Sequence, residues 1–148
     1  MKHDTLGSVD AVRADNTVML TWHGDRRFEA GRAGGPTIRM DGDTTTAPSP
    51  VDALISALAG CTAVDVVDIL KKRRTEPTAL EIVVTAQRSD GTPRRVVKVH
   101  LAYRITGGGV EHDHALRAID LAVTKYCSVR DSLDPELPVT WSLDILPG

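Results

Sequence analysis

The residues of this chain best suited to covalent chemistry are its two cysteines, Cys61 and Cys127. A cysteine reacts as its thiolate, and two cysteines can reduce a peroxide in sequence: the first thiol becomes a sulfenic acid and the second condenses with it to a disulfide. Taken singly, each cysteine fits an inert core position equally well. Two interpretations therefore stay open, a two-cysteine redox site and a pair of packed thiols.

The surroundings of Cys61 determine whether its thiolate can form. It lies in the middle of a predicted long helix, where the helix dipole gives little help, so a cation must come from elsewhere. Arg39 and Arg32, in the segment before the helix, are the natural donors, with Arg39 preferred. Asp65, one turn after Cys61, opposes activation because a nearby carboxylate raises a thiol pKa.

Cys127 lies where one predicted helix stops and a shorter one starts. At such a junction a side chain can be locally exposed, and the backbone N–H groups of the following helix can stabilise negative charge. A thiol within the core together with a second one at a helix boundary is the arrangement that a two-cysteine peroxidase needs.

The helix that carries Cys61 is predicted over residues 49–74. Ser49, Pro50 and Asp52 form a capping-box start, and the basic run at residues 71–74 complements the negative C-terminal end. Apolar residues recur at spacings of three and four, and alanines fill much of the remaining surface. At about 1.5 Å per residue the helix would be roughly 35 Å long, enough to cross a small domain.

Two features of this helix point to a tightly packed neighbour. Gly60 costs roughly 1 kcal/mol against alanine, and a close approach of another backbone is the usual reason to keep such a glycine. Either a second copy of the helix packs against Gly60, or the glycine leaves space for a substrate. Because one face of a small sheet cannot cover a helix that is apolar on most sides, we predict a homodimer with an extensive apolar interface.

The remaining chain predicts an α+β fold with mostly antiparallel sheet, in a single domain over residues 1–148. A strand meander (1–40) precedes the central helix, with strands at 8–13, 17–22, 27–30 and 37–40. A hairpin (79–105), a second group of helices (112–134) and a final strand (137–146) follow the central helix. In that second group, we expect a helix from His112 to Tyr126 capped by Asp113, and a short helix after Cys127.

Composition narrows the range of functions. The chain has 148 residues, a formal charge of −2 and a pI near 6.2, so nucleic acid is an unfavourable partner. Asp65 and Asp68 interrupt the longest apolar stretch, so we expect no membrane span, and the polar N-terminus favours a cytoplasmic protein. Two cysteines without zinc-like spacing predict neither a disulfide framework nor a metal, and no cofactor is expected.

Three stretches of the sequence resemble a known family. Residues 47–54 (APSPVDAL) and 57–67 (ALAGCTAVDVV) are similar to the central helix of the OsmC/Ohr family, and residues 125–129 (KYCSV) are similar to the segment that carries its second cysteine. The order of elements also agrees with that family over most of the chain.

The resemblance implies an intertwined homodimer with the two long helices in the middle and active sites at the subunit interface. It also implies a thiol-dependent peroxidase for small organic hydroperoxides, regenerated by a dithiol or a lipoylated protein. Cys61 would be the peroxidatic cysteine, Cys127 the resolving one and Arg39 the activating residue. The alternative is a non-enzymatic dimer of the same fold that binds a small apolar or sulfur-containing ligand, with inert cysteines.

This sequence differs from the better-characterised branches at two places. Those branches place a Glu ten residues before the peroxidatic cysteine, where this chain has Val51, and the nearest carboxylate is Asp52. Their Cys-Pro at the second cysteine is replaced by Cys127-Ser128. Together with Asp65, these differences resemble a less-studied branch of the family.

Overall fold

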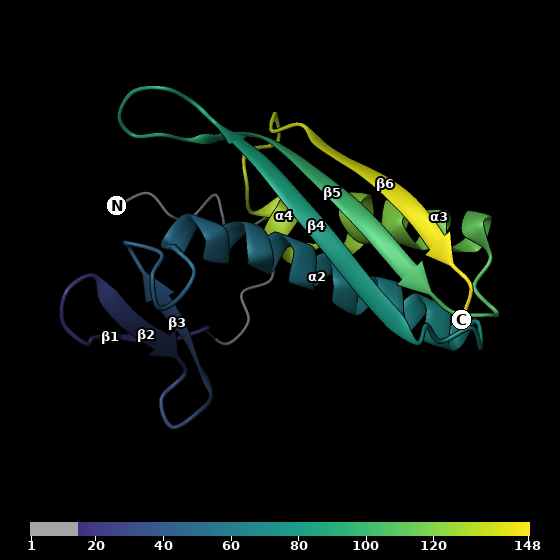
Figure 1. The fold of residues 1–148 in the computed structure, drawn as a ribbon, viewed down its shortest axis with the longest axis horizontal. Coiled ribbons are helices and arrows are strands. Elements are labelled where there is room, and N and C mark those ends of the chain that lie inside the picture. The colour runs from purple at the N-terminus through teal and green to yellow at the C-terminus, as the bar shows by residue number, and fades with distance from the viewer. Residues whose placement is uncertain (1–14) are drawn as a thin grey trace. The chain divides into compact units, whose positions relative to one another are not determined.

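The computed structural model describes residues 15–148, and the chain divides into two compact units, residues 1–50 and residues 51–148 (Figure 1). Each unit has its own sheet of three strands. The units are described separately below. The predicted strand at residues 8–13 lies outside the described residues.

The first unit is an antiparallel meander of β1 (Met19–Trp22), β2 (Arg27–Gly31) and β3 (Thr37–Asp41). Trp22 pairs with Phe28, and Phe28 pairs in turn with Met40. The turn between β1 and β2 includes Gly24 at φ +92°, a conformation that glycine adopts without strain. The predicted strands at 17–22, 27–30 and 37–40 are confirmed within a few residues.

A carboxylate organises the chain after β3. Asp41 is 1% exposed and accepts hydrogen bonds from the backbone N–H of Asp43, and from both the N–H and the hydroxyl of Thr45 and Thr46, at 2.8–3.3 Å. These donors favour the ionised form and hold the pKa of Asp41 well below its usual range. The threonine-rich linker therefore supplies most of the hydrogen-bond donors to this one carboxylate.

The second unit contains the long helix α2 (Pro50–Lys72), which confirms the predicted central helix. Its C-terminus closes in a Schellman motif: Arg74 has φ +61°, its N–H donates to the Lys71 carbonyl at 2.9 Å, and the Thr75 N–H donates to the Leu70 carbonyl at 2.9 Å. Pro77 follows, as expected beyond a helix end.

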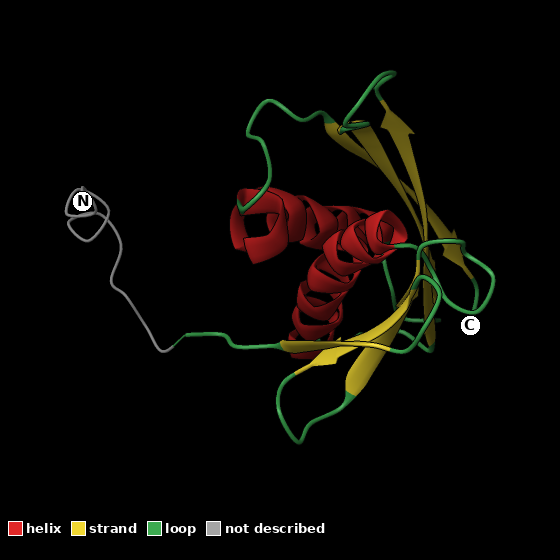
Figure 2. Ribbon diagram, turned by 90° about the vertical axis from the view of Figure 1, so that its left-hand side faces the viewer, coloured by secondary structure: helices red, strands yellow, loops and turns green. Residues whose placement is uncertain are grey.

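The sheet of the second unit has the order β4-β5-β6, formed by β4 (Ala79–Arg88), β5 (Val96–Thr106) and β6 (Val139–Leu146). β4 and β5 form the predicted antiparallel hairpin, whereas β6 runs parallel to β5. A parallel pair needs a crossover, which the helical segment between β5 and β6 supplies. Figure 2 shows the helices in red beside this sheet, whose inner positions form the core: Val99, Leu101, Tyr103 and Ile105 of β5 are at most 1% exposed.

The crossover consists of α3 (His112–Leu121), a π-helical segment η1 (Ala122–Tyr126) and the short α4 (Ser128–Asp131). The predicted helix over 112–126 is therefore confirmed in extent, but its last five residues change hydrogen-bond pattern. The expected cap is wrong: Glu111 occupies the N-cap position of α3 without a side-chain hydrogen bond, and Asp113 lies in the first turn.

One side of α2 packs on the sheet, and another side of the helix is exposed in the single chain. Leu58, Val66 and Leu70 are at most 1% exposed, whereas Leu54 and Val64 are 41% and 61% exposed. A Cβ at Gly60 would meet no atom within 4 Å, so the close neighbour that this glycine suggests is absent among residues 15–148. By length and composition α2 could also span a membrane, contrary to the sequence-based expectation, although a core helix has the same properties.

We predict that Asp41→Asn destabilises the first unit at neutral pH and flattens its stability profile in acid. A lowered native pKa contributes stability that is present above the unfolded pKa of about 4 and is lost as the pH falls below it. Denaturant unfolding of wild type and variant between pH 7 and pH 2.5 measures this. The matched control is Asp43→Asn, which removes a half-exposed carboxylate whose ion pair with Arg26 spans 3.3 Å and should change little. Equal effects of the two substitutions would contradict the prediction.

Candidate functional site

The two cysteines, 66 positions apart in the sequence, come together in the second unit, close enough for Cys61 to influence the pKa of Cys127. Both are free thiols. Cys61 lies on α2 and is partly exposed, whereas Cys127 is 3% exposed. The pair thus combines a thiol that a small molecule can reach with a buried thiol beside it, which is what successive oxidation and disulfide closure need.

The π-helical segment positions Cys127. Its backbone N–H donates to the Ala122 carbonyl at 2.9 Å, a five-residue step that ends η1, and Cys127 itself is extended at φ −75° and ψ 106°. Single π turns within helices are frequent at functional sites. Here the wider turn ends the helix at the cysteine and aims its side chain toward α2.

Cys127 is also the N-cap of α4, the short helix expected after it. The Arg130 backbone N–H donates to the Cys127 sulfur at 3.2 Å. This confirms the expectation that N–H groups of the following helix reach Cys127. Sulfur is an uncommon capping acceptor, so the sequence did not predict this cap.

Burial nevertheless outweighs the cap. Burial and the neighbouring Cys61 raise the pKa of the Cys127 thiol to about 11, although the Arg130 N–H lowers it. Cys127 is therefore a neutral thiol near pH 7.

A pair of buried hydroxyls lies near the cysteines, and the sequence did not single them out. Thr62 donates to the Ala59 carbonyl at 2.8 Å, so its 2.6 Å contact with the Tyr103 hydroxyl is donated by Tyr103. Burial and, to a smaller extent, charge on nearby Cys127 raise the pKa of Tyr103 to about 12, although the hydrogen bond with Thr62 lowers it. Strand alternation in β5 could have predicted Tyr103 as an inward residue, but not its partner.

The predicted activating arginines belong to the first unit, whereas both cysteines belong to the second unit. Arg39 is on β3, 74% exposed, with its Nε 3.5 Å from Glu29 Oε1. Arg32 is in the β2–β3 loop, with Nη2 3.5 Å from Asn16 Oδ1. Pairing of Arg39 with Cys61 stays a prediction, and so does the choice between Arg39 and Arg32.

The other residues singled out near Cys61 lie on α2. Asp65 is half-buried one turn after Cys61, and Asp52 is half-buried in the first turn. Val51, at the position of the family Glu, lines an apolar groove with Leu54 and Leu58. The start of α2 therefore presents a hydrocarbon wall at the position where the sequence lacks a carboxylate.

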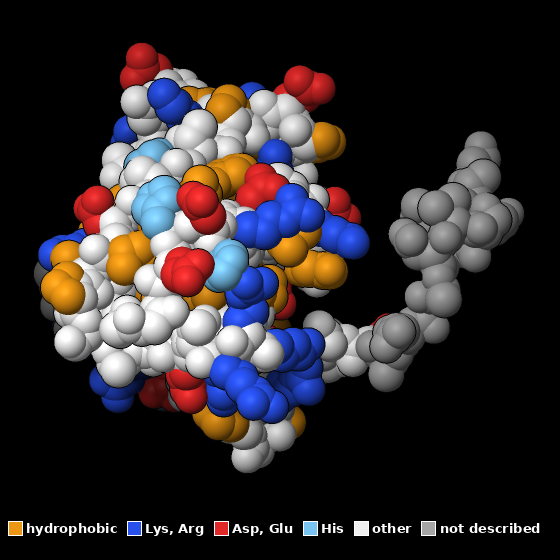
Figure 3. Space-filling model, turned by 90° about the vertical axis from the view of Figure 1, so that its right-hand side faces the viewer, with side chains coloured by type: hydrophobic (Ala, Val, Ile, Leu, Met, Phe, Trp, Pro, Cys, Tyr) orange, Lys and Arg blue, Asp and Glu red, His pale blue; other side chains and the backbone are white. Residues whose placement is uncertain are grey.

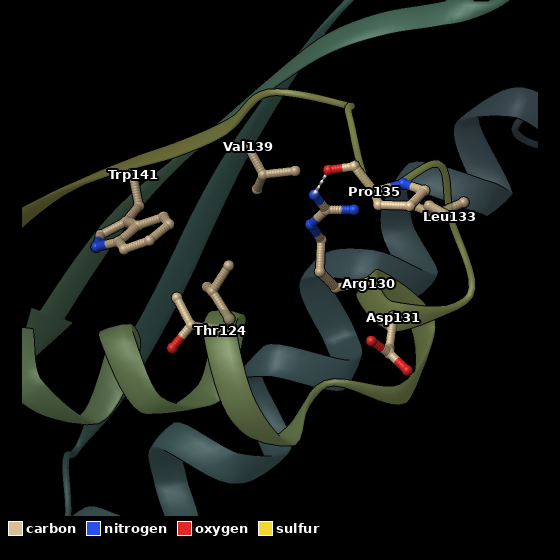
Figure 4. Close-up of a pocket in the computed structure, with 8 residues that line it drawn as sticks. Thr124, Arg130, Asp131, Leu133, Pro135, Val139 and Trp141 are labelled. Carbon is tan, nitrogen blue, oxygen red and sulfur yellow. Dashed lines mark hydrogen bonds between the residues drawn. The ribbon is translucent and has the colours of Figure 1, made fainter. Parts of the chain in front are cut away.

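A cavity of about 360 Å³ is lined by residues of η1, α4, β6 and the loop before β6 (Figure 4). Its central guanidinium, Arg130, points toward the loop before β6 and donates to the carbonyls of Asp134, Pro135 and Leu137 at 2.9–3.4 Å. Arg130 therefore holds that loop against α4, and its main-chain N–H holds Cys127. Its role is structural support of the thiol pair.

The acidic and histidine-rich start of α3 belongs to a surface network. His114 Nε2 is 2.7 Å from Arg73 Nη2, and Nδ1 is 3.3 Å from Glu111 Oε2; Figure 3 shows histidine side chains beside acidic and basic ones. Since Arg73 can only donate, Nε2 accepts and Nδ1 carries the proton. Both ring nitrogens of His114 therefore have neighbouring side chains as partners.

Comparison with known proteins identifies the family of this chain. Residues 41–142, which contain both cysteines, match the family described as OsmC-like protein. The chain belongs to the OsmC-like family. Protein YhfA of Escherichia coli K12 is 34% identical over 128 residues, covering 86% of this OsmC-like chain and 96% of YhfA.

Solved structures share the OsmC-like fold. A hypothetical protein from Aquifex aeolicus is 24% identical with a TM-score of 0.81, over 92% of this chain and 99% of that one. An organic hydroperoxide resistance protein OsmC from Legionella pneumophila is 15% identical with a TM-score of 0.60, over 89% and 99%. These likenesses establish the fold, and the predicted α+β class is confirmed.

We predict that iodoacetamide modifies Cys61 of this OsmC-like protein before Cys127 at pH 7–8. Cys61 is partly exposed, whereas Cys127 is buried and its pKa is raised to about 11, so rapid modification of native Cys127 should begin only above about pH 10. Timed alkylation followed by peptide mass spectrometry measures the order. Cys61→Ser and Cys127→Ser provide single-thiol controls. Faster modification of Cys127 at pH 7 would reverse the assignment of roles.

Proposed function

We propose that this OsmC-like protein is a thiol-dependent peroxidase that reduces small organic hydroperoxides through Cys61 and Cys127, in oxidative stress defence. The proximity of a partly exposed thiol to a buried thiol is the observation that carries the proposal. The Legionella pneumophila relative, described as an organic hydroperoxide resistance protein, supports the same chemistry.

The proposed cycle has three steps. The Cys61 thiolate attacks the distal oxygen of ROOH, the O–O bond breaks, and the alkoxide takes a proton and leaves as ROH. The Cys127 sulfur then attacks the Cys61 sulfenic acid, loses its proton, and releases water as the disulfide forms. An external dithiol, free or on a lipoylated protein, reduces this disulfide and is itself oxidised.

Arg39 is the residue proposed to stabilise the Cys61 thiolate and the leaving oxygen. Its support is the charge requirement at Cys61 and its family position in the segment before α2. Glu29 already orients Arg39 at 3.5 Å, and the Thr37 hydroxyl donates to the same carboxylate at 3.3 Å. A carboxylate from β2 can thus orient the guanidinium in a chain that has Val51 at the family Glu position.

The proposal includes that the protein is a homodimer and that it is cytoplasmic. The open side of α2 supports the dimer, because Leu54, Ala57, Gly60 and Val64 present exposed apolar or small groups along one helix. Burial of apolar surface is the main favourable term in association, and Gly60 allows a close helix approach. The site of Cys61 would then lie next to the second subunit.

The direct test is the stoichiometry of thiol loss when reduced protein meets one equivalent of cumene hydroperoxide at pH 7. We expect rapid loss of both thiols and a Cys61–Cys127 disulfide in the digest, because the two cysteines lie close to each other. Cys61→Ser should abolish peroxide consumption. Cys127→Ser should still consume about one equivalent and stop at the sulfenic acid.

The alternative function gives a different result. If both thiols stay free over minutes with cumene hydroperoxide and with hydrogen peroxide, the peroxidase is wrong. The non-enzymatic dimer that binds a small apolar or sulfur-containing ligand then becomes the better description. The apolar groove beside α2, about 320 Å³, favours that second candidate.

We predict that Val64→Asp converts the proposed dimer to a monomer, because it places a carboxylate in the centre of the open side of α2. Light scattering after size-exclusion chromatography measures the mass. The matched control is Val83→Asp, which changes a valine of similar exposure, 57% against 61%, on β4. Dimers in both variants would remove this side of α2 from the interface.

A further inference from the structure

A buried hydroxyl pair joins α2 to β5 in the core of the second unit. Thr62 is 0% exposed and Tyr103 is 1% exposed, and their side-chain oxygens are 2.6 Å apart. Because the Thr62 hydroxyl donates to the Ala59 carbonyl at 2.8 Å, the Tyr103 hydroxyl donates to Thr62. The pKa of Tyr103 is raised to about 12, chiefly by burial, so the phenol keeps this proton throughout the neutral range.

Each of the two hydroxyls interrupts an apolar row. The buried positions of α2 at spacings of four are Leu58, Thr62, Val66 and Leu70. The buried positions of β5 at alternate residues are Val99, Leu101, Tyr103 and Ile105. Each row therefore has one side chain with a polar atom, and these two side chains meet. Buried polar groups that satisfy each other specify one arrangement of a core, because any other arrangement leaves them without partners.

The hydroxyl pair fixes how the helix sits on the strand. Moving α2 along its axis by one turn would place Leu58 or Val66 opposite the Tyr103 hydroxyl, which would then be buried without an acceptor. Rotating α2 by one residue, about 100°, would turn Thr62 away from β5. The aliphatic rows alone accept more than one alignment, because hydrophobic contacts are not directional. The hydroxyl pair therefore selects one alignment of α2 on β5.

The selected alignment also sets the direction of Cys61. Cys61 directly precedes Thr62 on α2, so the two side chains leave the helix about 100° apart. Cys127 lies close enough to both elements that Cys61 raises its pKa, while charge on Cys127 raises the pKa of Tyr103. Side chains from α2, β5 and the crossover thus come together around Cys127.

We propose that Tyr103 is a positioning residue for the two cysteines: by donating to Thr62, it holds α2 in the one alignment that turns Cys61 toward Cys127. In this role the phenol acts through Thr62, the next residue along the helix, and takes no part in the sulfur chemistry itself. The hydrogen bond raises the effective concentration of one thiol at the other and so favours closure of the Cys61–Cys127 disulfide.

As a step of the peroxidase cycle, this role rests on the proposed function, because it assists the attack of Cys127 on oxidised Cys61. As a property of the two thiols it does not, since other thiol oxidants close the same bond. With oxidised glutathione, the two thiols give up two protons and two electrons, the S–S bond forms between Cys61 and Cys127, and two molecules of glutathione are released.

The first test measures the reduction potential of this disulfide in glutathione redox buffers at pH 7, with thiols counted by alkylation and mass spectrometry. In Tyr103→Phe the ring still fills the core, and Thr62 keeps the Ala59 carbonyl as its acceptor, so the fold is retained. We expect the equilibrium constant for disulfide formation to fall about fivefold, the size of one buried hydrogen bond. This change raises the reduction potential by about 20 mV.

Tyr126→Phe is the matched control. It removes the same oxygen from a tyrosine that directly precedes Cys127 but is 49% exposed, and its reduction potential should equal that of wild type. Equal potentials in wild type and Tyr103→Phe would overturn the proposal, and so would an equal rise in Tyr126→Phe. A wild-type protein that keeps both thiols in excess oxidised glutathione would overturn it as well.

A purely structural role of Tyr103 gives a different result. Equal losses of stability in the reduced and oxidised forms leave the potential unchanged, whereas positioning couples the hydrogen bond to the disulfide. Tyr103→Phe should therefore cost more stability in the oxidised protein than in the reduced one, by the same factor of about five in the unfolding equilibrium constant. Denaturant unfolding of both forms measures the two costs, and equal costs would contradict positioning.

The second test asks whether the two hydroxyls act as one unit. Thr62→Ser keeps the hydroxyl and should retain the wild-type potential. The double variant Tyr103→Phe/Thr62→Val replaces both partners by apolar groups of similar shape, so it should have the potential of Tyr103→Phe alone. A further rise in the double variant would show that Thr62 acts without Tyr103, and the positioning role would then be wrong.

These measurements separate the inference from the peroxidase, because exchange with glutathione needs no peroxide. A disulfide whose potential depends on Tyr103, in a protein that does not consume cumene hydroperoxide, would leave the positioning role and remove the peroxidase. Peroxide consumption with equal potentials in wild type and Tyr103→Phe would do the reverse.

Discussion

The packing of α2 against β5 is the interaction on which the rest of the second unit depends. Leu58, Val66 and Leu70 bury one side of the helix on the inner face of the sheet, and Thr62 meets Tyr103 in the same layer. Rotating the helix by one residue, about 100°, would separate both the hydroxyl pair and the thiol pair. The position of Cys61 is thus set by aliphatic packing from about one turn before it, at Leu58, to about two and a half turns after it, at Leu70.

The crossover between β5 and β6 places the second sulfur. A regular α-helix through residue 126 would carry Cys127 further around the helix, whereas the π turn ends the helix at Cys127 and lets it cap α4. Burial then outweighs the backbone N–H of Arg130 and keeps this thiol protonated. The two sulfurs differ in exposure because Cys127 is enclosed by the core, whereas Cys61 is partly exposed.

The start of α2 is apolar where the better-characterised branches of the family place a Glu. Val51 lines an apolar groove there together with Leu54 and Leu58. Within the first unit, Arg39 has Glu29 as its carboxylate partner across the β2–β3 pair. The charge partner of this arginine is therefore a residue of the neighbouring strand.

The sequence by itself determined the elements, and it offered Cys61 and Cys127 as a candidate pair. Local signals specified α2 from its capping box to its basic end and the β4–β5 hairpin from its turn, because caps, turns and periodicity act over a few residues. Tertiary structure alone decided the proximity of the two thiols, the raised pKa of Cys127, the Thr62–Tyr103 pair and the groove beside α2. Each joins segments distant in sequence, and burial, which sets their energies, is a property of the packed chain.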